Sequence, residues 1–96
     1  MEYNYNRREV YIPEKYFRKD RLIQLTQREN EIFSLLYLKK DKCATYSEIC
    51  KALYGYNDIS KYDKNSISTI ISRMRKKGID IVPLYGYGYK LKGGNK

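Results

Sequence analysis

The stretch from Lys64 to Lys77 constrains the fold of this chain more than any other segment. Its apolar residues recur at the spacing of a single helical stripe, and they are Ile67, Ile70, Ile71 and Met74. Gly78 follows directly, and a glycine at this position is typical of a helix C-terminus. The segment therefore predicts an amphipathic helix over residues 64–77 that packs one side on a core.

The opposite face of this predicted helix carries short polar and basic side chains, namely Asn65, Ser68, Thr69, Ser72, Arg73 and Lys76. An ordinary solvated face usually pairs Glu with Lys four residues apart, but no acidic residue occurs between Ser66 and Lys77. Short side chains let a helix approach base edges, and Arg can make two hydrogen bonds to guanine. We therefore expect this face to enter a DNA major groove.

Four cations lie close together at the end of the same segment: Arg73, Arg75, Lys76 and Lys77. Cations in a last turn also suit the helix dipole, so they could serve solubility alone. Their density exceeds that need, and we expect at least two of them to contact phosphate. Arg75 lies nearer the apolar stripe, which indicates a partly structural role.

The charge of the whole chain agrees with this interpretation. Its 96 residues suffice for one domain, and 20 Lys and Arg against 11 Asp and Glu give a net charge of +9. A basic balance of this size indicates a polyanionic partner, most often nucleic acid. A solvated basic surface without a specific partner is the alternative. No basic amphipathic segment has the Trp, Phe and Leu face that docking on a membrane surface needs.

Several other classes of protein are disfavoured by the sequence. No apolar run is long enough to span a bilayer, and the N-terminus has no hydrophobic signal region, so we predict a cytoplasmic protein. Cys43 and Cys50 are the only cysteines and there is no His, which argues against a zinc site and favours free thiols. Neither a His-activated nucleophile nor a glycine-rich phosphate loop is present. We therefore expect neither an enzyme nor a bound cofactor or metal.

The N-terminal part predicts a small antiparallel sheet. Short β-like segments cover residues 10–12, 16–18 and 22–25, with Pro13 between the first two and a turn at Lys19 and Asp20 before the third. Residues 1–8 are expected to form a flexible arm or the lead-in to a strand, residues 9–92 the folded domain, and residues 93–96 a disordered tail.

Two capping-box motifs mark the starts of two further helices. Thr26 with Glu29 precedes a helix over about 27–39, and Thr45 with Glu48 precedes one that ends near residue 53. Gly55 can close the second helix in the left-handed conformation. A polar loop over 56–63 then leads to the 64–77 helix.

A hairpin is predicted after Gly78. Residues 80–84 favour a strand, and two glycines beside Tyr87 favour a tight turn before a return strand with Tyr89 and Leu91. Tyr87 and Lys90 are candidate contacts from this hairpin. The order of elements is that of an α+β winged helix-turn-helix with three helices, a short N-terminal antiparallel sheet and a C-terminal β-hairpin wing.

An ordered set of residues then resembles a known family. These residues are Leu25-Thr26, Glu29, Leu35-Leu36, Thr45, Ile49, Leu53-Tyr54-Gly55, Ser66-Ile67, Ile71-Ser72-Arg73-Met74-Arg75-Lys76 and Gly86-Tyr87-Gly88-Tyr89-Lys90-Leu91. Over about residues 22–91 the chain resembles the C-terminal effector domain of OmpR/PhoB-type response regulators. The resemblance implies a winged helix-turn-helix that binds promoter double-stranded DNA, commonly as head-to-tail pairs on direct repeats.

The resemblance also implies roles for individual residues. Arg73 occupies a position that often reaches bases or phosphates, Arg75 a typically basic position, and Ser66 a position that commonly touches phosphate. Residues 56–63 correspond to a loop that can contact RNA polymerase. The chain departs from the family pattern at three positions: Ile70 replaces a frequent His, Tyr85 a frequent wing Arg, and Tyr54 a frequent Trp.

The sequence contains no receiver domain and no phosphorylatable aspartate module. If the chain is complete, phosphorylation in cis cannot regulate it. If it is an excised domain, that conclusion does not hold.

A second hypothesis is an adaptor that contacts RNA polymerase or another regulator. Tyrosine is favoured at protein interfaces, and Tyr56, Asp58 and Tyr62 lie in the tyrosine-rich segment 54–63. A third, weaker hypothesis is single-stranded nucleic-acid binding by exposed tyrosines. The target sequence, the choice between activation and repression, the oligomeric state and the regulating signal stay open.

Overall fold

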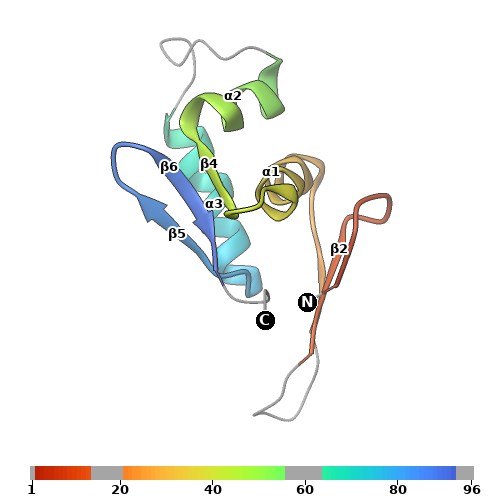
Figure 1. The fold of residues 1–96 in the computed structure, drawn as a ribbon. Coiled ribbons are helices and arrows are strands. Elements are labelled where there is room, and N and C mark those ends of the chain that lie inside the picture. Colours follow the sequence, from red (N-terminus) through yellow and green to blue (C-terminus); the bar gives the residue numbers. More distant parts are fainter. Residues whose placement is uncertain (1, 14–20, 56–63, 93–96) are drawn as a thin grey trace.

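The computed structural model describes residues 2–13, 21–55 and 64–92 of the chain. In chain order the elements are β1 (Glu2–Asn4), β2 (Glu9–Ile12), β3 (Arg21–Gln24), α1 (Gln27–Leu38), β4 (Cys43–Thr45), α2 (Tyr46–Tyr54), α3 (Lys64–Lys77), β5 (Ile81–Leu84) and β6 (Gly88–Leu91). They form two three-stranded antiparallel sheets, ordered β1-β2-β3 and β4-β6-β5. The N-terminal sheet and the β5–β6 hairpin lie on opposite sides of the molecule, with α1 and α3 between them (Figure 1). The predicted α+β winged helix-turn-helix is confirmed.

Both predicted capping boxes are present and fix where the first two helices begin. The Thr26 hydroxyl accepts from the Glu29 amide at 3.3 Å, and the Glu29 carboxylate accepts from the Thr26 amide at 2.8 Å. Thr45 and Glu48 repeat the pattern at 3.1 and 2.8 Å. These bonds satisfy amides that would otherwise lack a partner at a helix start.

The core lies under one stripe of α3. All four stripe residues are buried: Ile67, Ile70, Ile71 and Met74. They belong to one cluster with Phe33 and Leu36 of α1 and Ile49 of α2. The stripe predicted from spacing therefore docks α3 on both other helices, and its opposite face is left toward solvent.

The N-terminal sheet begins earlier than the sequence suggested. The flexible arm expected over residues 1–8 is wrong for Glu2–Asn4, which form β1 and pair with β2. The Tyr3 ring holds this strand, because its centroid lies 4.6 Å from that of Phe33 and 5.3 Å from that of Tyr37. The Tyr3 hydroxyl also donates to the Asn30 side chain. The strand expected over residues 16–18 lies outside the described residues.

The C-terminal sheet contains a strand that the sequence analysis missed. β4, just before α2, pairs with β6, so Gly88 lies opposite Thr45 on one side and Leu84 on the other. The backbones are close at this point, and a Cβ on Gly88 would lie 1.9 Å from the Ala44 carbonyl oxygen. The Tyr46 amide also donates to the Tyr87 carbonyl at 3.0 Å. The predicted hairpin is thus bonded to the segment where α2 begins.

Candidate nucleic-acid interface

The polar face of α3 is accessible over its length. Its exposed residues are Asn65, Ser68, Thr69, Ser72, Arg73 and Lys76, with Ser66 half-buried beside them. The residues of α3 include no Asp or Glu, so nothing on the helix offsets its cations. A face of short hydroxyls and basic groups presents hydrogen-bond donors to a polyanion. Its contact with DNA remains a prediction.

The wing is fixed against one side of α3. The Arg75 side chain donates through Nε to the Ile81 carbonyl oxygen at 2.7 Å, which joins α3 to β5. Arg75 is therefore partly structural, as its position near the apolar stripe indicated. Tyr89 of β6 is half-buried, with its ring centroid 5.9 Å from that of Tyr46, and burial raises the pKa of its hydroxyl.

The wing tip is aromatic rather than cationic. Tyr85 is 89% exposed and Tyr87 is 46% exposed, and between them Gly86 takes a left-handed φ of 79°. Lys90 is exposed on β6 and supplies a positive charge near the tip. A neutral wing gives less electrostatic attraction to a backbone than an arginine wing would.

The structure gives Lys77 structural partners within the protein. Its amine lies 2.5 Å from a Glu29 carboxylate oxygen and donates to the Gln24 carbonyl at 2.8 Å. Glu29 is only 2% exposed, so the amine neutralises a buried charge. Lys77 therefore links the end of α3 to the start of α1, and its contact with a phosphate stays a prediction.

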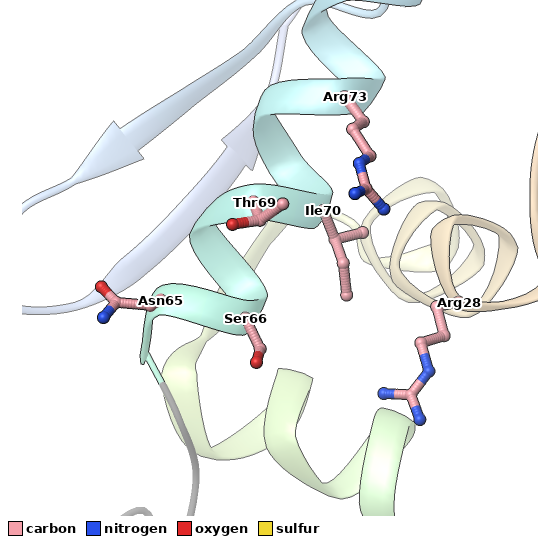
Figure 2. A pocket seen from close by; sticks show the side chains of 6 residues that line it. All are labelled: Arg28, Asn65, Ser66, Thr69, Ile70 and Arg73. Atoms are coloured by element: carbon pink, nitrogen blue, oxygen red, sulfur yellow. The ribbon is translucent and has the colours of Figure 1, made fainter.

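A hollow of about 340 Å³ lies on the side of α3 that faces α1 and α2 (Figure 2). Its lining residues are Arg28, Asn65, Ser66, Thr69, Ile70 and Arg73. An adjoining hollow of about 320 Å³ shares Arg28, Ile70 and Arg73 and reaches the first turn of α1. The two hollows extend the polar face of α3 sideways onto a second helix.

Arg28 is the lining residue that sequence analysis missed. It stands between the two capping-box residues of α1, where local pattern assigns it only to a helix start. The packing of α1 against α3 brings it to the hollow that Arg73 also lines. No local sequence signal reports this, since the two arginines are far apart in the chain.

The remaining predicted sites are not placed by the structure. Tyr56, Asp58 and Tyr62, the candidate protein contacts, lie outside the described residues. Across residues 2–13, 21–55 and 64–92, no group of three or more His, Cys, Asp or Glu side chains is placed to hold a metal ion. In those same ranges no helix combines the length and apolar character needed to cross a membrane.

Comparisons with known proteins agree with this geometry. A family model described as "Transcriptional regulatory protein, C terminal" matches residues 19–91. Among solved structures, the DNA-binding domain of the response regulator AdeR is similar to this chain, with a TM-score of 0.69 and 26% sequence identity. The match covers 96% of this chain and 93% of that one, and that domain was crystallised in complex with an intercistronic region. Curated protein sequences give no significant match.

Proposed function

This chain belongs to the family of transcriptional regulatory protein C-terminal domains and is a DNA-binding transcriptional regulator. We propose the following mode of DNA binding. The protein binds a specific duplex sequence with α3 in the major groove and the wing, residues 80–91, on the adjacent backbone or minor groove. The observation that carries the proposal is the exposed, acid-free face of α3, backed by a buried apolar stripe. The DNA complex of the similar AdeR domain supports the same partner for this chain.

The residues of the interface divide by chemistry. Arg73 carries base recognition, since its guanidinium can make two hydrogen bonds to guanine. Short side chains around it, Thr69 and Ser72, allow close approach. Phosphate contacts come from the remaining polar groups, which are Asn65, Ser66, Ser68, Arg75, Lys76, Tyr87 and Lys90.

Wider aspects of the function follow from family resemblance. We propose that two copies bind direct repeats head to tail, and that the loop over residues 56–63 contacts RNA polymerase. We also propose that the protein works in the cytoplasm, without enzymatic activity or a cofactor. Selection of bound duplexes from a random pool identifies the site and tests the proposal.

The selected duplex then allows a matched pair of substitutions. Arg73→Ala should reduce discrimination between the selected duplex and a shuffled one by roughly tenfold, because a base contact is lost. Lys76→Ala should weaken binding to both duplexes alike, because a phosphate contact carries no sequence information. Equal affinity of the unaltered protein for both duplexes would reject sequence specificity. Loss of regulation from changes at Tyr56 and Tyr62 alone would favour the adaptor hypothesis instead.

A further inference from the structure

The two arginines at the hollow are notable for their lack of counter-charges. Within the part of the chain that the structure describes, neither Arg28 nor Arg73 forms an ion pair with a carboxylate. The carboxylate nearest in sequence, Glu29, is occupied by the Lys77 amine and the Thr26 amide. Two cations thus line one depression from two different helices, an arrangement that attracts an anion.

The Arg28 side chain has a defined support. Its guanidinium carbon lies 5.3 Å from the centroid of the Tyr54 ring, at the end of α2. A guanidinium over an aromatic face gains a cation–π attraction while its N–H groups stay available. Tyr54 therefore limits the positions of this long side chain. The Arg28 guanidinium lies beside the hollow (Figure 2).

The lining of the hollow matches one sugar-phosphate unit. Ile70, only 8% exposed, contributes an apolar surface, and Ser66 and Thr69 contribute hydroxyls. One guanidinium can donate two parallel hydrogen bonds to the oxygens of a phosphate. An apolar surface suits the carbon atoms of a deoxyribose. An acidic peptide would satisfy the arginines but has no comparable need for the Ile70 surface.

The position of the hollow agrees with this chemistry. The major groove is about 12 Å wide, so a helix in it lies between two phosphate backbones. The wing is fixed on the Arg75 side of α3, where Arg75 bonds to β5. The hollow lies on the side that faces α1, where the second backbone would pass.

We infer that Arg28, supported by Tyr54, binds a backbone phosphate of the DNA strand that flanks α3 on the side away from the wing. The inference rests on the proposed function and extends the interface to α1. The contact is independent of sequence and helps to fix the angle at which α3 enters the groove.

The test compares charge-matched variants on the selected duplex and a shuffled duplex over a range of salt concentrations. Arg28→Gln should weaken binding to both duplexes about fivefold to tenfold, and should reduce the slope of log K against log salt by about 0.9. Arg28→Lys should restore part of the affinity because it keeps the charge. Lys40 is an exposed cation past the other end of α1, and Lys40→Gln should change affinity less than about twofold. Thermal melting of each variant checks the fold.

The remaining outcomes overturn the inference. An Arg28→Gln protein that binds like Lys40→Gln has lost no phosphate contact. A loss of affinity with an unchanged salt slope indicates a structural role, and a loss confined to the selected duplex indicates a base contact. A defect in binding an acidic protein partner with normal DNA affinity assigns the hollow to that partner. Failure of the unaltered protein to bind any duplex rejects the proposed function itself, which the Arg28 variants alone cannot do.

Discussion

Lys76 and Lys77 are adjacent, carry the same charge and have different environments. Lys76 is exposed on the polar face of α3, whereas the Lys77 amine lies against the buried Glu29 carboxylate. A helical turn of 100° per residue separates the two directions. Equal charge in a basic run therefore does not imply equal function, and replacing each lysine should separate binding from stability.

Lys77→Ala should lower the free energy of unfolding by roughly 2–3 kcal/mol, because it leaves a buried carboxylate without its cation. Denaturant unfolding measures this change. Lys76→Ala is the matched control and should stay within about 0.5 kcal/mol of the unaltered protein. Adding Glu29→Gln to Lys77→Ala should recover part of the loss, since no buried charge then remains. A double variant no more stable than Lys77→Ala would contradict this account.

The ion pair between Lys39 and Glu48 gives the protein a pH dependence. The Lys39 amine, 2.7 Å from the carboxylate, lowers the pKa of Glu48 below its ordinary value of 4.5, and the Thr45 amide adds to the effect. The same pair raises the pKa of Lys39 above 10.5. A lowered carboxyl pKa contributes stability above the unfolded value that is lost as pH falls through the folded value. A raised amine pKa contributes stability that is lost at the alkaline end.

The expected contribution is small, about 0.5 kcal/mol, because both side chains are about one-third exposed and solvent screens them. Glu48→Gln should keep a capping side chain while removing this part of the acid sensitivity below pH 4.5. Unfolding free energies measured at pH 7 and at about pH 3.5 give the comparison. An unchanged pH dependence in the variant would show that the pair does not stabilise the fold.

At the scale of elements, the wing depends on close contact between β6 and β4. Gly88→Ala should destabilise the protein by about 2 kcal/mol or more, because the new methyl group would overlap the Ala44 carbonyl oxygen. Gly86→Ala is the control at the wing tip. It meets open space but keeps a φ of 79°, so about 1 kcal/mol is expected. Thermal melting ranks the two. A Gly88 variant as stable as the Gly86 variant would show that β4 yields to the added atom.

Sequence patterns predicted those features that depend on near neighbours. Both capping boxes, the 64–77 helix and the turn at Gly86 rest on residues within about one helical turn or one tight turn of each other. The features that were missed join distant segments. Glu29 and Lys77 are 48 residues apart, and Tyr3 meets Asn30 across 27 residues. β4 has only three residues, too few for a recognisable strand pattern, and it is a strand because it pairs with β6. No window along the chain contains such pairs.

At the scale of the whole molecule, α3 differs from the N-terminal sheet in having charges of one sign only. The N-terminal sheet and its turn carry charges of both signs, which are Glu2 and Glu9 together with Arg7, Arg8 and Arg21. This sheet is on the far side of the molecule from the wing (Figure 1). All charged residues of α3, in contrast, are cations. Such an arrangement directs the positive side toward an approaching polyanion.

This distribution predicts a steep dependence of DNA affinity on salt. If four to six phosphates are neutralised, log K against log salt should have a slope of about −4 to −5. Fluorescence anisotropy at several salt concentrations measures it with the selected duplex. A slope shallower than about −2 would mean that few phosphates are contacted, whatever the net charge of the chain.

The bonds that hold the wing have a consequence for the kind of DNA site the protein accepts. β6 is bonded to β4, which leads into α2, and β5 is bonded to Arg75 of α3. These bonds fix the distance between α3 and the hairpin tip within the protein. One base pair inserted between the DNA region that α3 contacts and the region that the wing contacts would shift one region by about 3.4 Å relative to the other. It would also rotate that region by roughly 35° about the duplex axis. Natural binding sites should therefore tolerate a change of base identity more readily than a change in the number of base pairs between the regions that α3 and the wing contact. DNA bending would have to compensate for such an insertion or deletion.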